Sequence, residues 1–166
     1  MGHIHLDSEY DYTASATIVH NNKVLLLFHH KLHLWLPPAG HIELHEHPIE
    51  ALYRETEEET GLTKEHLTLL LPYKDNLSLE RDPETNLSLP IPFDIDVHTV
   101  NDQGHRHIDL SYIFVSDTDQ VRKEEGGAEQ LEWFTLDEIE KLSPMPRKVY
   151  SHAAYALELA ARESER

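Results

Sequence analysis

The stretch GHIELHEHPIEALYRETEEETGL, residues 40–62, is the most informative part of this chain. It crowds Glu55, Glu57, Glu58 and Glu59 into five positions beside Arg54. Side chains of like charge repel one another when they stand three or four residues apart on a helix. Another group must therefore offset the repulsion, or the run must lie open to water.

The same stretch carries the start and stop signals of a helix. Pro48 suits the first helical turn, where the missing N–H of proline costs no hydrogen bond. Gly61 is a natural terminator, because glycine adopts the left-handed conformation at little cost. We therefore expect a helix from Pro48 to Thr60.

The predicted helix has two distinct sides. Successive residues turn by about 100°, so Glu55, Glu58 and Glu59 share one side. The residues expected to pack on a sheet lie on another side: Ile49, Leu52, Thr56 and, at its edge, Tyr53. Three carboxylates on a rigid helix suit a hard cation such as magnesium or manganese, which would offset their repulsion. The alternative is an ordinary solvated acidic face.

Runs typical of strands flank this helix on both sides. They cover residues 13–20, 23–30, 66–73, 94–100, 107–116 and 132–136. Asn21 and Asn22 tolerate positive φ and predict a hairpin turn between the first two runs. Pro37 and Pro38 break any regular element, and the polar residues 74–93 read as a long loop.

The C-terminal part of the chain is predicted to be helical. Thr135 and Glu138 make a capping box for a short helix. Residues 146–162 predict a final helix with one apolar face, formed by Val149, Ala153, Leu157 and Ala160. Strands, a helix, more strands and then helices indicate the α/β class, with a mixed sheet and helices packed on it.

The composition limits the classes of function. The 166 residues suit a single domain over 1–166. A net charge of -17 repels the phosphates of long nucleic acids and of anionic lipids, so neither is an expected partner. There are no cysteines, which excludes thiolate chemistry and fits a reducing compartment. No signal peptide or membrane-spanning run is evident, so we expect a cytoplasmic protein.

The glutamate stretch resembles the signature of the Nudix hydrolases. Its spacing is G-x5-E-x7-R-E-x-x-E-E-x-G-L, from Gly40 to Leu62, and every charged and glycine position of the family motif is present. The one departure is Thr56, which stands where the motif has a bulky aliphatic residue and for which we expect a small stability cost. LWLPPAGHIE and EWFTLDEI also look like the segments that usually precede the motif and end the family's domain.

The resemblance implies the Nudix fold, a mixed β-sheet sandwiched between α-helices, and a metal-dependent mechanism. Nudix enzymes hydrolyse a nucleoside diphosphate linked to another group, usually with Mg²⁺; Mn²⁺ is an alternative here. By motif position, Glu55, Glu58 and Glu59 would be metal ligands, with the carbonyl of Gly40 completing the shell. Arg54 would form an ion pair with Glu46 that orients the loop and Glu55.

The general base is left open by the resemblance. It is Glu55 or, as in some members, a glutamate on a loop before the late strand. RKEEGGAEQLEW offers Glu124, Glu125 and Glu129, of which Glu129 is the first candidate and Glu125 the second. The alternative is that these are ordinary loop charges.

Other residues are candidates for substrate contacts, each with a structural alternative. Trp35, Tyr73 and Tyr112 could stack on a base, although aromatic side chains are more often core. Arg106 and Lys31 could contact phosphate. In HRHIDL, His105, His107 and Asp109 would point to the same side of a strand, as a phosphate or metal contact or merely as a polar strand end.

Six further histidines raise the alternative of a zinc site, but their spacing matches no zinc pattern that we recognise. They crowd the approach to the motif at positions 29, 30, 33, 41, 45 and 47.

The leading hypothesis is a Mg²⁺-dependent pyrophosphohydrolase. Its small-molecule substrate is a nucleoside diphosphate sugar such as ADP-ribose, a nucleoside triphosphate or a dinucleoside polyphosphate. The alternative is a nucleotide-sensing Nudix domain without catalysis, which is disfavoured because every motif carboxylate is present. Isopentenyl diphosphate isomerisation needs a cysteine, which the chain lacks. A homodimer is possible for a member of this family.

Overall fold

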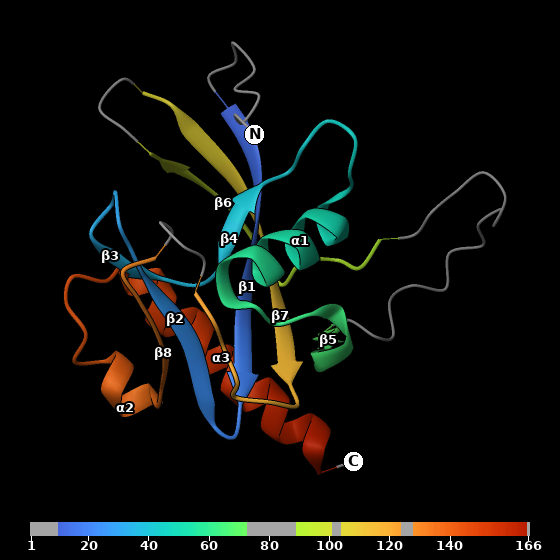
Figure 1. The fold of residues 1–166 in the computed structure, drawn as a ribbon, viewed down its shortest axis with the longest axis vertical. Helices are drawn as coiled ribbons and strands as arrows, with labels where there is room; N and C mark the ends of the chain where they lie inside the picture. Colours follow the sequence, from blue (N-terminus) through green and yellow to red (C-terminus); the bar gives the residue numbers. More distant parts are fainter. Residues whose placement is uncertain (1–9, 73–88, 101–103, 124–127, 166) are drawn as a thin grey trace, which may run out of the picture.

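The computed structural model describes residues 10–72, 89–100, 104–123 and 128–165 (Figure 1). Its strands are β1 (Tyr10–His20), β2 (Lys23–His29), β3 (Leu34–Leu36), β4 (Ala39–His41), β5 (Leu67–Leu70), β6 (Asp94–Thr99), β7 (Arg106–Ser116) and β8 (Gln130–Phe134). Its helices are α1 (Pro48–Thr60), α2 (Leu136–Ile139) and α3 (Arg147–Ser164), with a 3₁₀ turn, η1, at Lys64–His66.

The sheet is mixed, as predicted. Its centre is the parallel pair β1 and β7, which runs from Tyr10 opposite Arg106 to Val19 opposite Val115. All other strand pairs are antiparallel: β5 and β6 pair with β7, and β8 pairs with β2. The long parallel pairing fixes which residues of β1 and β7 are neighbours, and this register determines much of the site described below.

The sheet forks between β1 and β2. These strands pair only next to their turn, where Asn21 and Asn22 have the predicted positive φ values of 44° and 61°. Beyond this point β4 pairs with β1, and β3 pairs with β2. Both short strands were missed from the sequence, because Pro37 and Pro38 prevent one long strand but allow three-residue pairings on either side.

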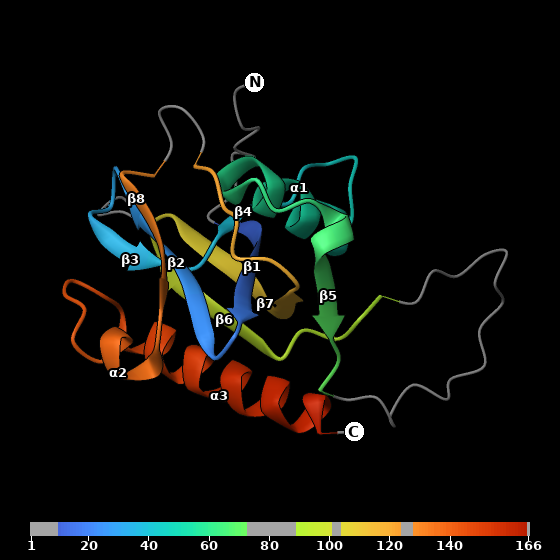
Figure 2. The same cartoon turned by 60° about the horizontal axis from the view of Figure 1, so that its bottom comes forward.

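Helices cover both faces of the sheet, so the predicted sandwich is confirmed (Figure 2). Helix α1 covers one face, over a core that includes Leu52, Leu62 and Phe114. Helix α3 covers the other face, over a core that includes Trp35, Ile113 and Val149. No helix in the described part of the chain is long and apolar enough to cross a membrane.

The last helix is longer than predicted, and its buried face is wider. It continues to Ser164, and its buried residues are Val149, His152, Ala153 and Ala156. The predicted Leu157 and Ala160 are partly buried against the same core. Most of the predicted 74–93 loop lies outside the described residues; only 89–93 can be followed.

Candidate active site

Helix α1 is held at both of its ends. It begins at Pro48 and ends before Gly61, whose φ of 73° is left-handed and whose N–H donates to the carbonyl of Glu57, as the sequence predicted. A capping box was not foreseen: the N–H of Glu50 donates to His47 Nδ1, and the N–H of His47 donates to Glu50 Oε2. Two specific caps make the helix a defined platform for its glutamates.

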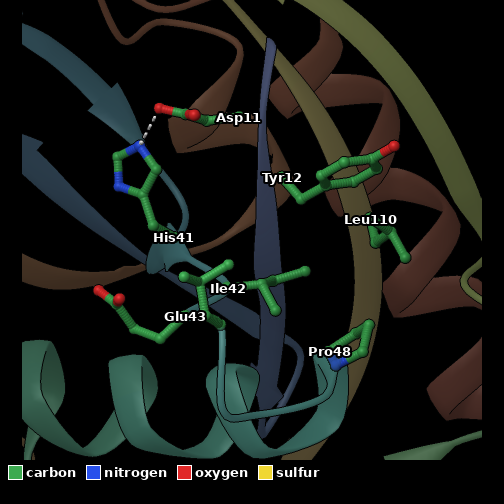
Figure 3. A pocket seen from close by; sticks show the side chains of 8 residues that line it. Asp11, Tyr12, His41, Ile42, Glu43, Pro48 and Leu110 are labelled. Atoms are coloured by element: carbon green, nitrogen blue, oxygen red, sulfur yellow. Dashed lines mark ion pairs between the residues drawn. The ribbon is translucent and has the colours of Figure 1, made fainter. Parts of the chain in front are cut away.

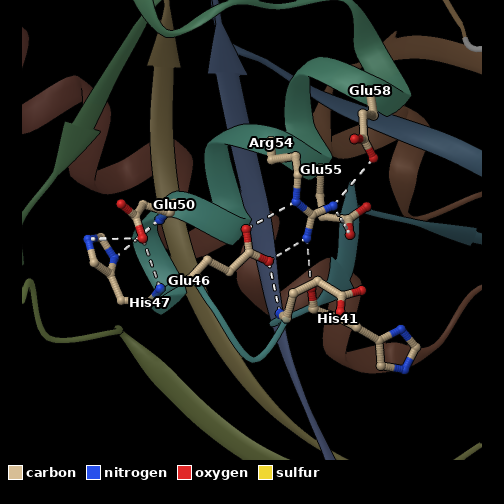
Figure 4. Close-up of polar contacts among 8 residues, drawn as sticks. His41, Glu46, His47, Glu50, Arg54, Glu55 and Glu58 are labelled. Carbon is tan, nitrogen blue, oxygen red and sulfur yellow. Dashed lines mark hydrogen bonds and ion pairs between the residues drawn. The ribbon is translucent and has the colours of Figure 1, made fainter. Parts of the chain in front are cut away.

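Arg54 connects the glutamates of the motif to one another (Figure 4). Its Nη2 and Nε donate to the two carboxylate oxygens of Glu46, over 2.6 and 3.1 Å, so the predicted ion pair is present. Its Nη1 donates to Glu55 over 2.6 Å and to Glu58 over 3.4 Å. Its Nη2 also donates to the carbonyl of His41 over 3.0 Å. A guanidinium therefore offsets part of the repulsion among these carboxylates.

The charges of this network stabilise one another. Burial alone would raise the pKa of Glu46, but hydrogen bonds from Arg54 and from the Glu43 N–H outweigh it, and the pKa is lowered. The hydrogen bond with Glu46, followed by that with Glu55, raises the pKa of Arg54. Both groups are therefore charged at neutral pH, which keeps the network intact.

Gly40 is the point where β4 touches the catalytic helix. A Cβ atom added to Gly40 would lie 1.9 Å from Glu55 Cδ and 2.3 Å from each carboxylate oxygen. Glu55 is itself buried, with only 8% of its surface exposed. The resemblance implied only that the Gly40 carbonyl completes the metal shell; in the structure, the Glu55 carboxylate also occupies the space where a side chain at position 40 would lie.

The other two predicted ligands differ in their surroundings. Glu59 Oε2 accepts a hydrogen bond from the N–H of Ala39 over 3.0 Å, which ties the helix to β4. The Glu58 side chain is 52% exposed. Its distance of 3.4 Å from Arg54 Nη1 is the longest among the hydrogen bonds that Arg54 makes with carboxylates. One guanidinium against the carboxylates of Glu46, Glu55 and Glu58 leaves surplus negative charge, so the donor set fits a hard divalent cation.

Thr56 is the motif position that departs from the family. It is 1% exposed, and among the described residues its Oγ1 has no hydrogen-bond partner. Its carbonyl accepts a hydrogen bond from Thr60 Oγ1. The buried, unpaired hydroxyl is the physical source of the small stability cost that we expect here.

Glu129, the predicted base on the late loop, has no contact with the glutamate network among the interactions of the described residues. Glu129 precedes β8, its N–H donates to the Phe28 carbonyl, and its carboxylate pairs with His30 Nδ1 over 3.1 Å. Glu124 and Glu125 lie outside the described residues. The structure thus gives Glu129 a histidine partner that the sequence did not suggest.

Of the candidates for stacking on a base, Trp35 and Tyr112 are buried, and Tyr73 lies outside the described residues. Trp35 is 7% exposed, and its ring packs edge-on against Phe28 and Phe134. Tyr112 is 3% exposed, and burial raises its pKa to about 12. These positions match the core alternative and give no support to stacking on a base.

Arg106, a candidate phosphate contact, lies on the surface. Its Nη1 donates to the hydroxyl of Tyr10 over 2.6 Å, and its guanidinium lies over the same ring. It therefore lies at the start of β7, next to His107. Its described contacts are with Tyr10 and not with a residue of α1.

A pocket of about 340 Å³ adjoins the segment that joins β4 to α1 (Figure 3). Much of its lining is apolar and comes from Tyr12, Ile42, Leu44, Pro48 and Leu110. Tyr12 is 55% and Leu44 70% exposed, although both are large hydrophobic residues. The sequence reasoning missed this surface, because these residues come from three separate segments.

The model of the NUDIX domain family matches residues 10–153. This chain belongs to the Nudix family. A NUDIX-family hydrolase from Clostridium perfringens is 32% identical to this Nudix protein, with a TM-score of 0.80; the match covers 90% of this chain and 97% of that one.

Several curated relatives are named as enzymes. A probable DHNTP pyrophosphohydrolase of Lactococcus lactis subsp. cremoris (strain MG1363) is 29% identical over 84% of this chain and 71% of its own length. The asymmetrical bis(5'-nucleosyl)-tetraphosphatase of Mus musculus is 38% identical over 28% of this chain and 32% of its own. The chain is thus a Nudix hydrolase acting on phosphorus-containing anhydride bonds.

Proposed function

We propose that this Nudix hydrolase is a Mg²⁺-dependent pyrophosphohydrolase that cleaves a nucleoside diphosphate linked to another moiety. The observation that carries the proposal is the network of Arg54 with Glu46, Glu55 and Glu58. It holds together carboxylates from a doubly capped helix and from the segment before it, and leaves them with surplus negative charge. An anionic diphosphate cannot approach such a site unless a cation accompanies it.

In this proposal Glu58, Glu59 and Glu55, with the carbonyl of Gly40, hold the cation. Bound Mg²⁺ supplies charge neutralisation for the diphosphate and lowers the pKa of a coordinated water. Arg54 holds Glu55 in one orientation, and Glu46 in turn orients Arg54. Glu59 keeps β4 against the helix, so Gly40 stays next to Glu55.

We assign the general base to Glu55 rather than to Glu129. Glu55 packs directly on Gly40, within the proposed metal shell. Glu129 would first have to leave His30, to which it is paired. Glu125, the other candidate base from the sequence, lies outside the described residues. Replacement of Glu129 by Gln should then change turnover little, whereas Glu55→Gln should abolish it.

The apolar pocket suits the part of the substrate that is not phosphate. The exposed ring of Tyr12 and the side chains of Ile42 and Pro48 offer a surface for a planar base. We propose for Tyr12 the stacking role for which the sequence offered Trp35, Tyr73 and Tyr112 as candidates. Candidate substrates are nucleoside diphosphate sugars such as ADP-ribose, nucleoside triphosphates and dinucleoside polyphosphates; the Lactococcus relative adds DHNTP.

The test measures release of phosphate or nucleoside monophosphate from a panel of these compounds, with Mg²⁺ and with Mn²⁺. Glu58→Gln is compared with Glu57→Gln, which removes the same charge from an exposed neighbour on the same helix. Turnover of one class that Glu58→Gln loses and Glu57→Gln keeps supports the proposal. Equal activity of both variants would refute it, and binding without turnover would favour the sensing alternative.

Several expectations from the sequence stay predictions. They are the single domain over 1–166, the cytoplasmic location and the homodimer. Gel filtration with light scattering measures the last of these. The net charge of -17 continues to argue against a long nucleic acid as partner.

A further inference from the structure

A second cluster of metal-ligating side chains lies at one end of the sheet. Asp11, His41, His105 and His107 each offer one ligand atom, and these atoms all lie within 4.8 Å of one another. None of the four occupies a charged or glycine position of the glutamate motif, although His41 directly follows Gly40. Their positions in the sequence, scattered over about a hundred residues, gave no sign that they meet.

The sheet register brings these residues together. β1 lies between β4 and β7 here, with Asp11 opposite His107 and Thr13 opposite His41. Side chains alternate along a strand, so Asp11 and Thr13 face the same side, as do their partners His107 and His41. Gly40, next to His41, faces α1. His41 therefore faces away from the catalytic helix, as Figure 3 shows for His41 and Asp11 against Tyr12 and Ile42.

The spacing is close to that of a four-coordinate site. Zinc bonds to histidine and carboxylate ligands are about 2.0–2.2 Å long, which places tetrahedral ligand atoms roughly 3.3 Å apart. His105 Nε2 lies 3.1 Å from Asp11 Oδ2, and His41 Nε2 lies 3.6 Å from the same atom. The His107 ring centroid is 4.9 Å from that of His41 and 5.4 Å from that of His105. Small side-chain rotations therefore suffice to close the shell.

The chemistry of the cluster favours a transition metal over Mg²⁺. Three imidazoles and one carboxylate suit zinc or a similar ion, whereas Mg²⁺ prefers oxygen ligands. Asp11 is 5% exposed, and one carboxylate balances the charge of only one protonated imidazole. The cluster is therefore a partly buried set of nitrogen and oxygen donors at the end of the sheet, close enough together to meet one ion.

We propose that Asp11, His41, His105 and His107 bind one zinc-type ion, distinct from the Mg²⁺ at the glutamates. The ion links the end of β4 to β1 and to β7 through its ligands. The carbonyl of His41 accepts a hydrogen bond from Arg54, and Gly40 beside it contacts Glu55. Metal at this site therefore stabilises the strand against which the catalytic helix is positioned.

The test uses the whole chain of 166 residues, stripped of metal with a chelator. His3 and His5 are replaced by Gln in every sample, so that these N-terminal histidines cannot add a site. Zinc affinity is measured by competition with a chromogenic chelator, and Co²⁺ is used to read the visible bands of a four-coordinate ion. The variants are His105→Gln and Asp11→Asn. The matched control is His66→Gln, which also removes an imidazole paired with a carboxylate.

We expect one equivalent of zinc per chain. At a free zinc concentration of about 100 times the Kd, the melting temperature should rise by roughly 5 to 10 °C. His105→Gln and Asp11→Asn should each weaken binding at least about tenfold, while His66→Gln and Glu58→Gln should bind as the parent does. Two cluster variants are used in case one of them does not fold. Circular dichroism without metal shows whether each variant is folded.

Three results would overturn the proposal. They are the absence of stoichiometric binding, binding that both cluster variants retain, or binding that Glu58→Gln removes, which would place zinc at the glutamates. Because the readouts are affinity, cobalt spectrum and melting temperature, they do not depend on whether any panel substrate is hydrolysed. Failure of the zinc site and failure of the proposed activity are therefore distinguishable.

Discussion

Replacement of Gly40 by Ala tests the contact between β4 and the catalytic helix most directly. The new Cβ would lie 1.9 Å from Glu55 Cδ, so the carboxylate must retreat by about 1.5 Å to reach ordinary van der Waals separation. Glu55 is buried and its Oε1 is held 2.6 Å from Arg54, so this retreat stretches or breaks that bond. The same movement displaces a proposed metal ligand.

The expected effects follow from the displacement. Overpacking a buried site costs about 1–3 kcal/mol of the free energy of unfolding, which corresponds to a fall in melting temperature of roughly 2 to 12 °C. A misplacement of about 1 Å at a catalytic group lowers kcat by about 10²-fold. The assays are thermal unfolding and steady-state kinetics with Mg²⁺ on the best substrate of the panel.

Two further variants test whether the collision between the new Cβ and Glu55 causes these losses of stability and activity. Ala39→Ser also adds one heavy atom to β4, but at an exposed residue, and should leave stability and kcat unchanged. Adding Glu55→Asp to Gly40→Ala shortens the colliding side chain, so the double variant should regain stability without regaining activity. If Gly40→Ala keeps kcat within threefold, or if Glu55→Asp gives no relief, the reasoning from the Gly40–Glu55 contact is wrong.

Three other predictions concern the stability of the helix and its network. Thr56→Val should raise the free energy of unfolding by about 1 kcal/mol, since it removes a buried unpaired hydroxyl at nearly constant volume; no gain in a urea titration would mean that the hydroxyl is satisfied in solution. Gly61→Ala should cost about 1–2 kcal/mol, because φ is 73° there and a Cβ would lie 3.3 Å from Arg122; an unchanged urea midpoint would contradict this. The folded pKa of Glu46 is lowered from about 4.5, so its charge stabilises the fold above that pH and ceases to do so as the pH falls through the lowered value. The parent should thus be more stable than Glu46→Gln at pH 7, and the difference should shrink as the pH falls below about 4.5; a constant difference between these pH values would refute the linkage.

Local patterns in the sequence determined the catalytic helix and the class of the fold. The helix boundaries followed from Pro48 and Gly61, and the shared side of Glu55, Glu58 and Glu59 followed from helical geometry. The turn at Asn21-Asn22 and the capping box at Thr135 were likewise foreseen. Such features depend on residues at most about four positions apart, so the chain itself displays them.

Only the tertiary structure decided which distant residues meet. The Glu55 carboxylate fills the space above Gly40, because helix packing brings β4 and α1 into contact. Trp35 and Tyr112 lie in the core, because the sheet is covered on both faces and both rings point into these layers. An aromatic residue in a strand carries no local sign of whether its side of the sheet is covered.

The histidine cluster shows the same limit most clearly. The sequence placed His105 and His107 on one side of a strand, but it did not connect them with Asp11 or His41. Their meeting depends on the parallel register of β1 with β7 and on the fork that allows β4 to pair with β1. Register between strands that are far apart in the chain is set by the packing of the whole sheet, and no spacing within the sequence encodes it.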